Sequence, residues 1–386
     1  MTSHTLSKVD TAAGTPGWAS VASMVTAALI GEYSLLIMPF IMLAMINSFG
    51  IDEGVAAQLV STQLFSMAVA ALVTSLVIAR LNLTNVVLTG AIAVIIANGA
   101  CATSSSVFAL TVGRIITGLG EGTIMAAASA IIASSRQHHK VYSVLGVAVA
   151  IAAALALSLV PLAVEQFDQR ATFWVLAGAP LLAVASAYWL PKTSRIDSSV
   201  IDLSVFRSIP ALSMLIAFGA LWFGAAALWV FAERIGSHQG LSLNQIGGYL
   251  AIGQLVGILG PIAAGRWGLR IGLRPATIMA CLGMIVGGAA FVFAPTGAIY
   301  ALGAALLSFF IMFLPPCFRS MMAEMDPVGR IVGASAGFYT IGFALAPILV
   351  VSLASAESGY SPIFVLSALF FLISAALAFA SQHKSP

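Results

Sequence analysis

Charged residues are scarce in this sequence. Asp, Glu, Lys and Arg together make up 8% of its 386 residues, whereas soluble domains carry roughly 25%. So few charges cannot cover a soluble surface, which excludes a cytosolic or secreted enzyme. The net charge of +3 is small and the basic residues are scattered, so we expect no nucleic-acid partner.

Cysteine is scarce too, and its pattern is uninformative for metals. The three cysteines, Cys101, Cys281 and Cys317, all lie inside apolar runs. An odd number without a Cys-x-x-Cys spacing predicts neither a disulfide framework nor a zinc site. We therefore expect no metal and no cofactor.

Long apolar runs dominate what is present. Hydrophobic residues reach 60% of the chain, and a membrane-spanning helix needs roughly 20 mostly apolar residues. These runs do not alternate as the strands of a membrane barrel do. The sequence therefore predicts an all-α integral membrane protein with twelve transmembrane helices in two six-helix halves. The predicted spans are residues 20–46, 55–79, 86–104, 107–133, 141–164, 172–190, 211–233, 245–265, 276–294, 298–322, 331–355 and 362–381.

The basic residues predict the orientation of these spans, because cytoplasmic segments carry an excess of Lys and Arg. With both termini inside, Arg170 and Arg234 lie outside, and Arg114 and Arg319 lie in the membrane. We therefore expect a multi-pass protein of the inner (plasma) membrane, with residues 1–18 as a cytoplasmic tail. The twelve basic residues expected inside are Lys8, Arg80, Arg136, Lys140, Lys192, Arg195, Arg207, Arg266, Arg270, Arg274, Arg330 and Lys384.

The chain also shows signs of an internal duplication. Residues 191–210 form a polar cytoplasmic linker between a first half, residues 1–190, and a second half, residues 211–386. Asp52 and Ser242, which we expect to cap the second and eighth helices, are 190 residues apart. The turns that begin at Ser75 and Gly265 have the same separation, as an internal repeat requires.

Two short motifs carry a family resemblance. Residues 265–274 read G-R-W-G-L-R-I-G-L-R, which is similar to the G-x-x-x-D-R-x-G-R-R motif of the major facilitator superfamily. Leu269 and Leu273 depart from that pattern. Residues 114–122 read R-I-I-T-G-L-G-E-G, which resembles the superfamily's R-x-x-x-G-x-G-x-G motif. The resemblance implies secondary transport by alternating access, with a site between the two halves.

The fifth span bears on the kind of transport. Drug–proton antiporters of this superfamily usually carry G-x-x-x-G-P there. In this sequence residues 146–152 read G-V-A-V-A-I-A, and the next proline is Pro161. This departure disfavours drug efflux without excluding it.

Ionisable residues at membrane depth predict the coupling site, because they are costly there. Glu32 lies in the middle of the first span, and Arg114 and Glu121 are seven residues apart on one face of the fourth. In the superfamily that the sequence resembles, these two helices border the central cavity. We predict a Glu32–Arg114–Glu121 cluster in which the arginine keeps one carboxylate ionised and the other takes a proton. Alternatively, Arg114 only locks the fourth helix to the first.

Aromatic residues suggest where a substrate binds. Trp222 and Trp229 are seven residues apart on the seventh span, and Glu32 plus the repeat offset of 190 falls on Trp222. They could line a pocket for an amphipathic organic compound, or pack against lipid and neighbouring helices. Arg319 would add an anion contact from the second half, unless its long side chain extends to the membrane–water interface. The weaker candidates are Tyr33, Phe309, Phe313, Tyr339 and Gln254.

Three arginines in cytoplasmic turns are the candidates for gating, namely Arg80, Arg270 and Arg274. They can clamp the cytoplasmic side through acids or helix C-termini when the opposite side is open. Because Leu269 stands where the motif has an acid, we expect this clamp to be weak.

Taken together, these features predict a proton-coupled symporter, a monomer in the lipid bilayer that moves a small organic solute. The sequence leaves open whether the solute is anionic. The first alternative is a proton-driven exporter of amphipathic compounds. A membrane enzyme or a sensor is disfavoured, because the sequence has neither clustered His, Asp or Cys at a membrane face nor a polar segment long enough for a soluble domain.

Overall fold

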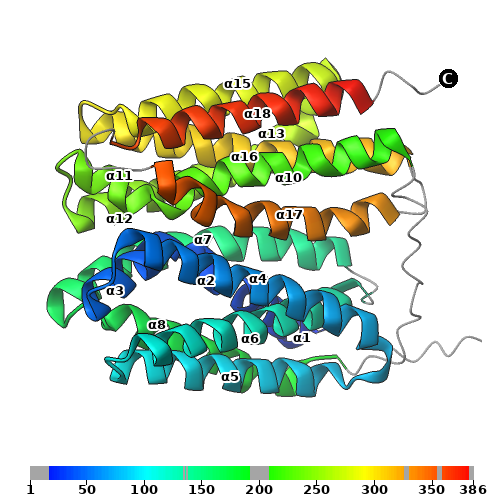
Figure 1. Cartoon of the computed structure of the whole chain (residues 1–386). Helices are drawn as coiled ribbons and strands as arrows, with labels where there is room; N and C mark the ends of the chain where they lie inside the picture. The colour runs from blue at the N-terminus through cyan, green and yellow to red at the C-terminus, as the bar shows by residue number, and fades with distance from the viewer. Residues whose placement is uncertain are drawn as a thin grey trace, which may run out of the picture.

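The structure is a computed structural model that describes residues 17–133, 135, 138–191, 208–325, 330–353 and 359–381. Within these ranges the chain folds almost entirely into helices (Figure 1). Most of the predicted tail and linker lie outside the described residues. So do six of the basic residues used to predict orientation, Lys8, Arg136, Lys192, Arg195, Arg207 and Lys384.

The helices before the linker form the first repeat. They are α1 (Trp18–Gly31), α2 (Tyr33–Leu36), α3 (Met38–Phe49), α4 (Glu53–Val77), η1 (Ile78–Arg80), α5 (Leu83–Thr103), α6 (Val107–Ala133), α7 (His138–Gln166), α8 (Ala171–Gly178), α9 (Pro180–Ser186) and η2 (Ala187–Trp189).

The helices after the linker form the second repeat. They are α10 (Ile209–Val230), α11 (Ala232–His238), α12 (Leu243–Gly257), α13 (Leu259–Ala263), the π-helical turn η4 (Ala264–Gly268), α14 (Leu269–Ile271), α15 (Leu273–Val292), α16 (Gly297–Met325), α17 (Arg330–Val350), η5 (Val351–Leu353) and α18 (Ser361–Ser381).

The predicted spans reappear in the structure. Ten stretches of the described chain are long and apolar enough to cross a membrane. The two remaining predicted spans correspond to α1–α3 and to α17. The all-α class is thus confirmed, with one correction. The first span is not a single helix but is interrupted at Glu32 and Ile37.

The two repeats pack side by side as two bundles (Figure 1). They meet where α4 lies along α17 and where α7 lies along α12. The α7–α12 crossing is close, because a methyl group at Gly247 would overlap the Leu157 carbonyl oxygen. Small residues permit such close approach of membrane helices.

Equivalent helix starts support the duplication. The Asp52 carboxylate accepts a hydrogen bond from the Val55 amide at 2.8 Å and caps α4. Ser242 caps α12 in a reciprocal capping box with Gln245. Both caps were predicted. Asn82 and Gly272, again 190 residues apart, precede α5 and α15. Gly272 has a φ of +87°, a conformation that favours glycine and explains why this motif position keeps one.

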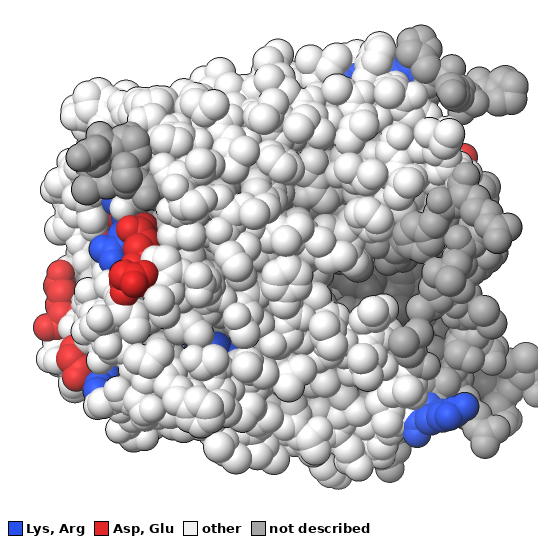
Figure 2. Space-filling view, viewed as in Figure 1, with Lys and Arg blue, Asp and Glu red and all other residues white. Residues whose placement is uncertain are grey.

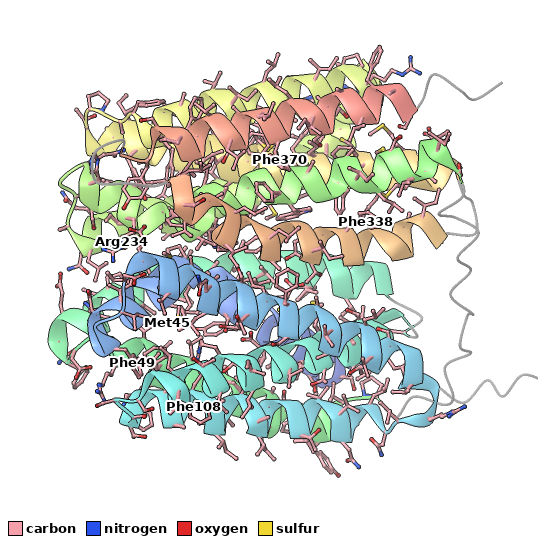
Figure 3. The ribbon with its side chains drawn as sticks, viewed as in Figure 1. Met45, Phe49, Phe108, Arg234, Phe338 and Phe370 are labelled. Carbon is pink, nitrogen blue, oxygen red and sulfur yellow. The ribbon has the colours of Figure 1, made fainter. Side chains whose placement is uncertain are left out.

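The two ends of the molecule differ. We call the end where η2 stops and α10 starts the linker end, and the other the far end. Figure 2 shows a recess between the bundles at the linker end, on the right, and charged side chains gathered at the far end. Arg234 of α11 and Met45 of α3 lie towards the far end (Figure 3), where α3 contacts α10 and α11 of the other repeat.

Candidate transport site

The interrupted first span is the starting point of the site. Glu32 and Ile37 have non-helical backbones, with φ of −117° and −119°, so α2 is a single turn between two breaks. Proline has no amide hydrogen, so Pro39 cannot donate to the carbonyl of Leu35, four residues earlier. Irregular backbone at membrane depth is tolerated where it is buried in protein or lines a cavity.

Glycines bring α6 against this broken helix and against α4. A methyl group at Gly118 would overlap the Gln63 carbonyl oxygen, and one at Gly31 would lie 2.8 Å from the backbone of Met125. Gly122 faces the Met67 carbonyl in the same way. The glycines of the Arg114 motif therefore act in packing, and they place polar side chains of α2 and α4 beside α6.

A buried polar network results, made of Ser34, Gln63, Asn98, Arg114 and Glu121. One oxygen of Glu121, Oε1, accepts hydrogen bonds from Ser34, at 2.6 Å from its hydroxyl and 3.2 Å from its amide. Gln63 donates to Oε2 of Glu121 at 3.2 Å. The side-chain oxygen of Gln63 accepts from Arg114 at 3.3 Å. Gln63 thus links the arginine to the carboxylate, and both charged side chains are almost fully buried.

The remaining contacts of Arg114 correct one prediction. Its NH2 donates to the Asn98 side-chain oxygen and to the Cys101 sulfur, and its guanidinium lies 5.3 Å from the centroid of the Phe173 ring. Among the described residues its Nε has no hydrogen-bond partner. The predicted contact between Arg114 and Glu32 is absent from these interactions, because α5 supplies acceptors on the other side of α6.

Glu32 instead interacts electrostatically with the second repeat. Its charged neighbour is Arg319 of α16, and both interact electrostatically with Tyr339 of α17. The ring of Trp222, on α10, packs edge-on against Tyr339 with centroids 4.6 Å apart. The indole nitrogen of Trp222 is buried and has no partner among the described residues. We call Glu32, Trp222, Arg319 and Tyr339 the central cluster.

The other predicted substrate residues lie in different surroundings. Trp229 donates from its indole nitrogen to the Leu35 carbonyl at 2.8 Å and so joins the two repeats. Phe313 is fully buried and packs among phenylalanines of α16. Tyr33 and Gln254 are half-buried.

The predicted gating arginines lie at the linker end. Arg80 and Arg270 are exposed, and Arg274 lies with its guanidinium 5.3 Å from the centre of the Phe379 ring. Within the described ranges the one ion pair is between Arg234 and Glu233, at the far end. We predicted that these arginines clamp the linker end when that end is closed. The structure has a recess at the linker end (Figure 2), so the clamp stays a prediction.

The far end holds a second contact between the repeats, which the sequence did not predict. The Tyr360 hydroxyl, just before α18, donates to Glu53 of α4 at 3.5 Å. Burial, followed by the nearby Glu53, raises the pKa of Tyr360 to about 12. Tyr360 therefore keeps its proton near neutral pH and remains a donor. Arg234 interacts electrostatically with Glu53 and pairs at 3.9 Å with the buried Glu233.

Two bundles related by a repeat, a broken helix at their interface and ionisable residues at membrane depth define a class of protein, the secondary transporters. Comparison with known proteins agrees. The family model of the Major Facilitator Superfamily matches residues 21–331, so the chain belongs to this superfamily. Its members are transporters and not enzymes.

Solved structures show the same fold. The D-xylose-proton symporter is 15% identical with a TM-score of 0.77, and the match covers 95% of this chain and 98% of that one. The nucleoside transporter NupG is 14% identical with a TM-score of 0.73, over 95% and 98% of the two chains. A bacterial homologue of the lysosomal transporter Spinster, in an inward-facing and occupied conformation, is 14% identical with a TM-score of 0.74, over 95% and 96%. No curated protein matches the chain.

Proposed function

We propose that this transporter is proton-coupled and moves a small organic solute by alternating access. The observation that carries the proposal is the central cluster. A carboxylate at a helix break in the first repeat, Glu32, interacts electrostatically with a cation of the second repeat, Arg319, close to the interface that must open and close. An ionisable residue at this depth is costly, so a functional site is the default hypothesis for it. The proton coupling named for the D-xylose symporter supports the same assignment.

The second repeat supplies the groups that would bind the solute. Trp222 and Tyr339 offer aromatic faces, and the Trp222 indole nitrogen offers a donor without a partner among the described residues. Arg319 is exposed and cationic. This combination favours a solute with a flat apolar part and an acceptor or anionic group.

The conformation fits one state of the transport cycle. The repeats touch at the far end through Trp229 and Tyr360, whereas a recess opens at the linker end (Figure 2). With the linker in the cytoplasm, as the basic residues predict, this is the inward-facing state.

Transport assays in proteoliposomes test the coupling. Glu32→Gln makes the side chain permanently neutral, so exchange of labelled for unlabelled solute, which moves no net proton, should persist. Accumulation driven by a pH gradient should disappear. Glu165→Gln, at an exposed acid of α7, is the control and should leave both activities unchanged. A Glu32→Gln protein that accumulates solute at the normal rate would disprove the role of Glu32.

A further inference from the structure

The short turn α2 contacts both a buried carboxylate and the other repeat. Ser34 binds Glu121 through its hydroxyl and its amide. The next residue, Leu35, offers its carbonyl to Trp229 at 2.8 Å. Glu121 belongs to the polar network of the first repeat, and Trp229 belongs to the second. Two adjacent residues therefore connect that network to the contact between the repeats.

We propose that Glu121 is a positioning residue whose ionised carboxylate holds α2 where the Leu35 carbonyl meets Trp229, and so keeps the far end closed. A proton on Glu121 releases the turn and favours opening of the far end. The inference rests on the proposed function only in taking the proton as the coupling ion, since it concerns a different carboxylate from Glu32.

The backbone explains why α2 depends on this carboxylate. In a continuous helix the Ser34 amide would donate to the carbonyl of Ile30, four residues earlier. The break at Glu32 removes that acceptor, and the amide donates to Glu121 instead. Hydrogen bonds to an ionised acceptor are roughly twice as strong as neutral ones, so the charge of Glu121 determines how firmly α2 is held.

The backbone also explains the hydrogen bond between Trp229 and the Leu35 carbonyl. The Leu35 carbonyl is available to Trp229 because Pro39, at the start of α3, has no amide hydrogen to offer it. The length of α2 is one turn. A displacement of Ser34 therefore displaces the Leu35 carbonyl with it.

A proton on Glu121 disturbs this arrangement directly. Ser34 donates to Oε1 and Gln63 donates to Oε2, and a proton on the carboxylate removes the negative charge that strengthens both hydrogen bonds. The charged and titratable groups around Glu121 are few. Arg114 lies on its own helix and acts through Gln63, Cys101 of α5 contacts Arg114, and Glu32 stands two residues before Ser34. Gln63, from α4, is neutral.

Distance measurements on the full chain test the proposal without any substrate. Spin labels at Phe108 and Ala298, exposed positions at the far-end starts of α6 and α16, report in lipid nanodiscs whether the far end is open. Glu121→Gln should raise the open-to-closed ratio about tenfold, the effect of losing a hydrogen bond to a charged group. Trp229→Phe, which keeps a ring but removes the donor, should do the same.

The double variant distinguishes the loss of the connection from Glu121 through α2 to Trp229 from a general destabilisation of the closed far end. Glu121→Gln combined with Trp229→Phe should open the far end no further than either change alone, because both break one connection. Tyr360→Phe removes a separate hydrogen bond between the repeats, the one to Glu53, and its effect should add fully to that of Glu121→Gln. Pro39→Ala restores an amide that competes with Trp229 for the Leu35 carbonyl, so it should imitate Trp229→Phe.

Acidification gives a readout that a purely structural role would not move. The wild-type far end should open as the pH falls, and Glu121→Gln should abolish that response while Glu32→Gln retains it. Full additivity between Glu121→Gln and Trp229→Phe would overturn the proposal, as would a normal pH response in Glu121→Gln.

If Glu121→Gln fails to fold, Ser34→Ala combined with Trp229→Phe gives an equivalent double-mutant cycle. Non-additivity in that cycle supports the proposal, and full additivity overturns it. The transport assays on Glu32 are independent of all these outcomes.

Discussion

The two repeats use equivalent positions for opposite chemistry. Glu32 of the first repeat corresponds to Trp222 of the second, and Arg114 corresponds to Ala304, at the common offset of 190. The first repeat buries a polar network around Glu121, whereas the second gathers aromatic rings around Trp222 and Tyr339. The same scaffold therefore accommodates a polar interior in one repeat and an aromatic interior in the other.

This asymmetry suggests a division of labour. Under the proposed function, the first repeat carries the proton and the second carries the contacts to the solute. Only Arg319 breaks the pattern, since it brings a cation from the second repeat to Glu32. Because the two repeats meet at these residues, binding at one side can change the charge balance of the other.

The largest expected effect comes from removing the cation of the polar network. Arg114→Ala leaves Glu121 buried without the arginine that Gln63 links to it. Breaking a buried charge arrangement costs about 3–5 kcal/mol, so we expect a protein that is strongly destabilised and inactive. Thermal unfolding in detergent measures the first effect, and solute exchange measures the second.

Arg319→Ala provides the matched comparison. Arg319 is exposed, so its loss should leave the melting temperature nearly unchanged while solute binding falls. Equal loss of stability in both variants would refute the division between the repeats.

A smaller effect should follow from crowding the α4–α6 contact. A methyl group at Gly118 would overlap the Gln63 carbonyl oxygen, and overpacking of this kind costs about 1–3 kcal/mol. Gly118→Ala should therefore lower the melting temperature and displace Gln63 from Glu121. At Gly99 of α5 an added methyl meets nothing within 4 Å. Gly99→Ala should be neutral or slightly stabilising, since alanine favours helix by about 1 kcal/mol over glycine.

Local features of the fold could be read from the sequence because their causes are local. Apolar runs predicted the spans, and the caps at Asp52 and Ser242 required only the residues that follow them. The breaks at Glu32 and Ile37 could not be read in the same way. The predicted first span runs through both positions, and the turn between them is held by Glu121 and Trp229 from distant helices.

The site was predicted in part for a related reason. The search for charged residues identified Glu32, Arg114 and Glu121. It missed the amides Gln63 and Asn98, which accept hydrogen bonds from Arg114. An amide inside an apolar run is a usable signal, since a buried polar group needs a partner. Which partner it finds depends on helix packing, and so the sequence could not assign Arg319 rather than Arg114 to Glu32.

The smallest expected effect tests the second repeat alone. Trp222→Phe keeps an aromatic ring near Tyr339 and Phe218 but removes the indole donor, which has no partner among the described residues. Stability should change little, because no hydrogen bond within the described protein is lost. If the donor serves the solute, the apparent affinity should fall about fivefold, the effect of one neutral hydrogen bond of about 1 kcal/mol. The maximal rate of exchange and the dependence on a pH gradient should both stay normal, since the proton groups of the first repeat are untouched. Exchange measured over a range of solute concentrations, with and without the gradient, separates these effects. A Trp222→Phe protein that loses its pH dependence would mean that coupling is not confined to the first repeat, and the contrast between the two repeats would fail.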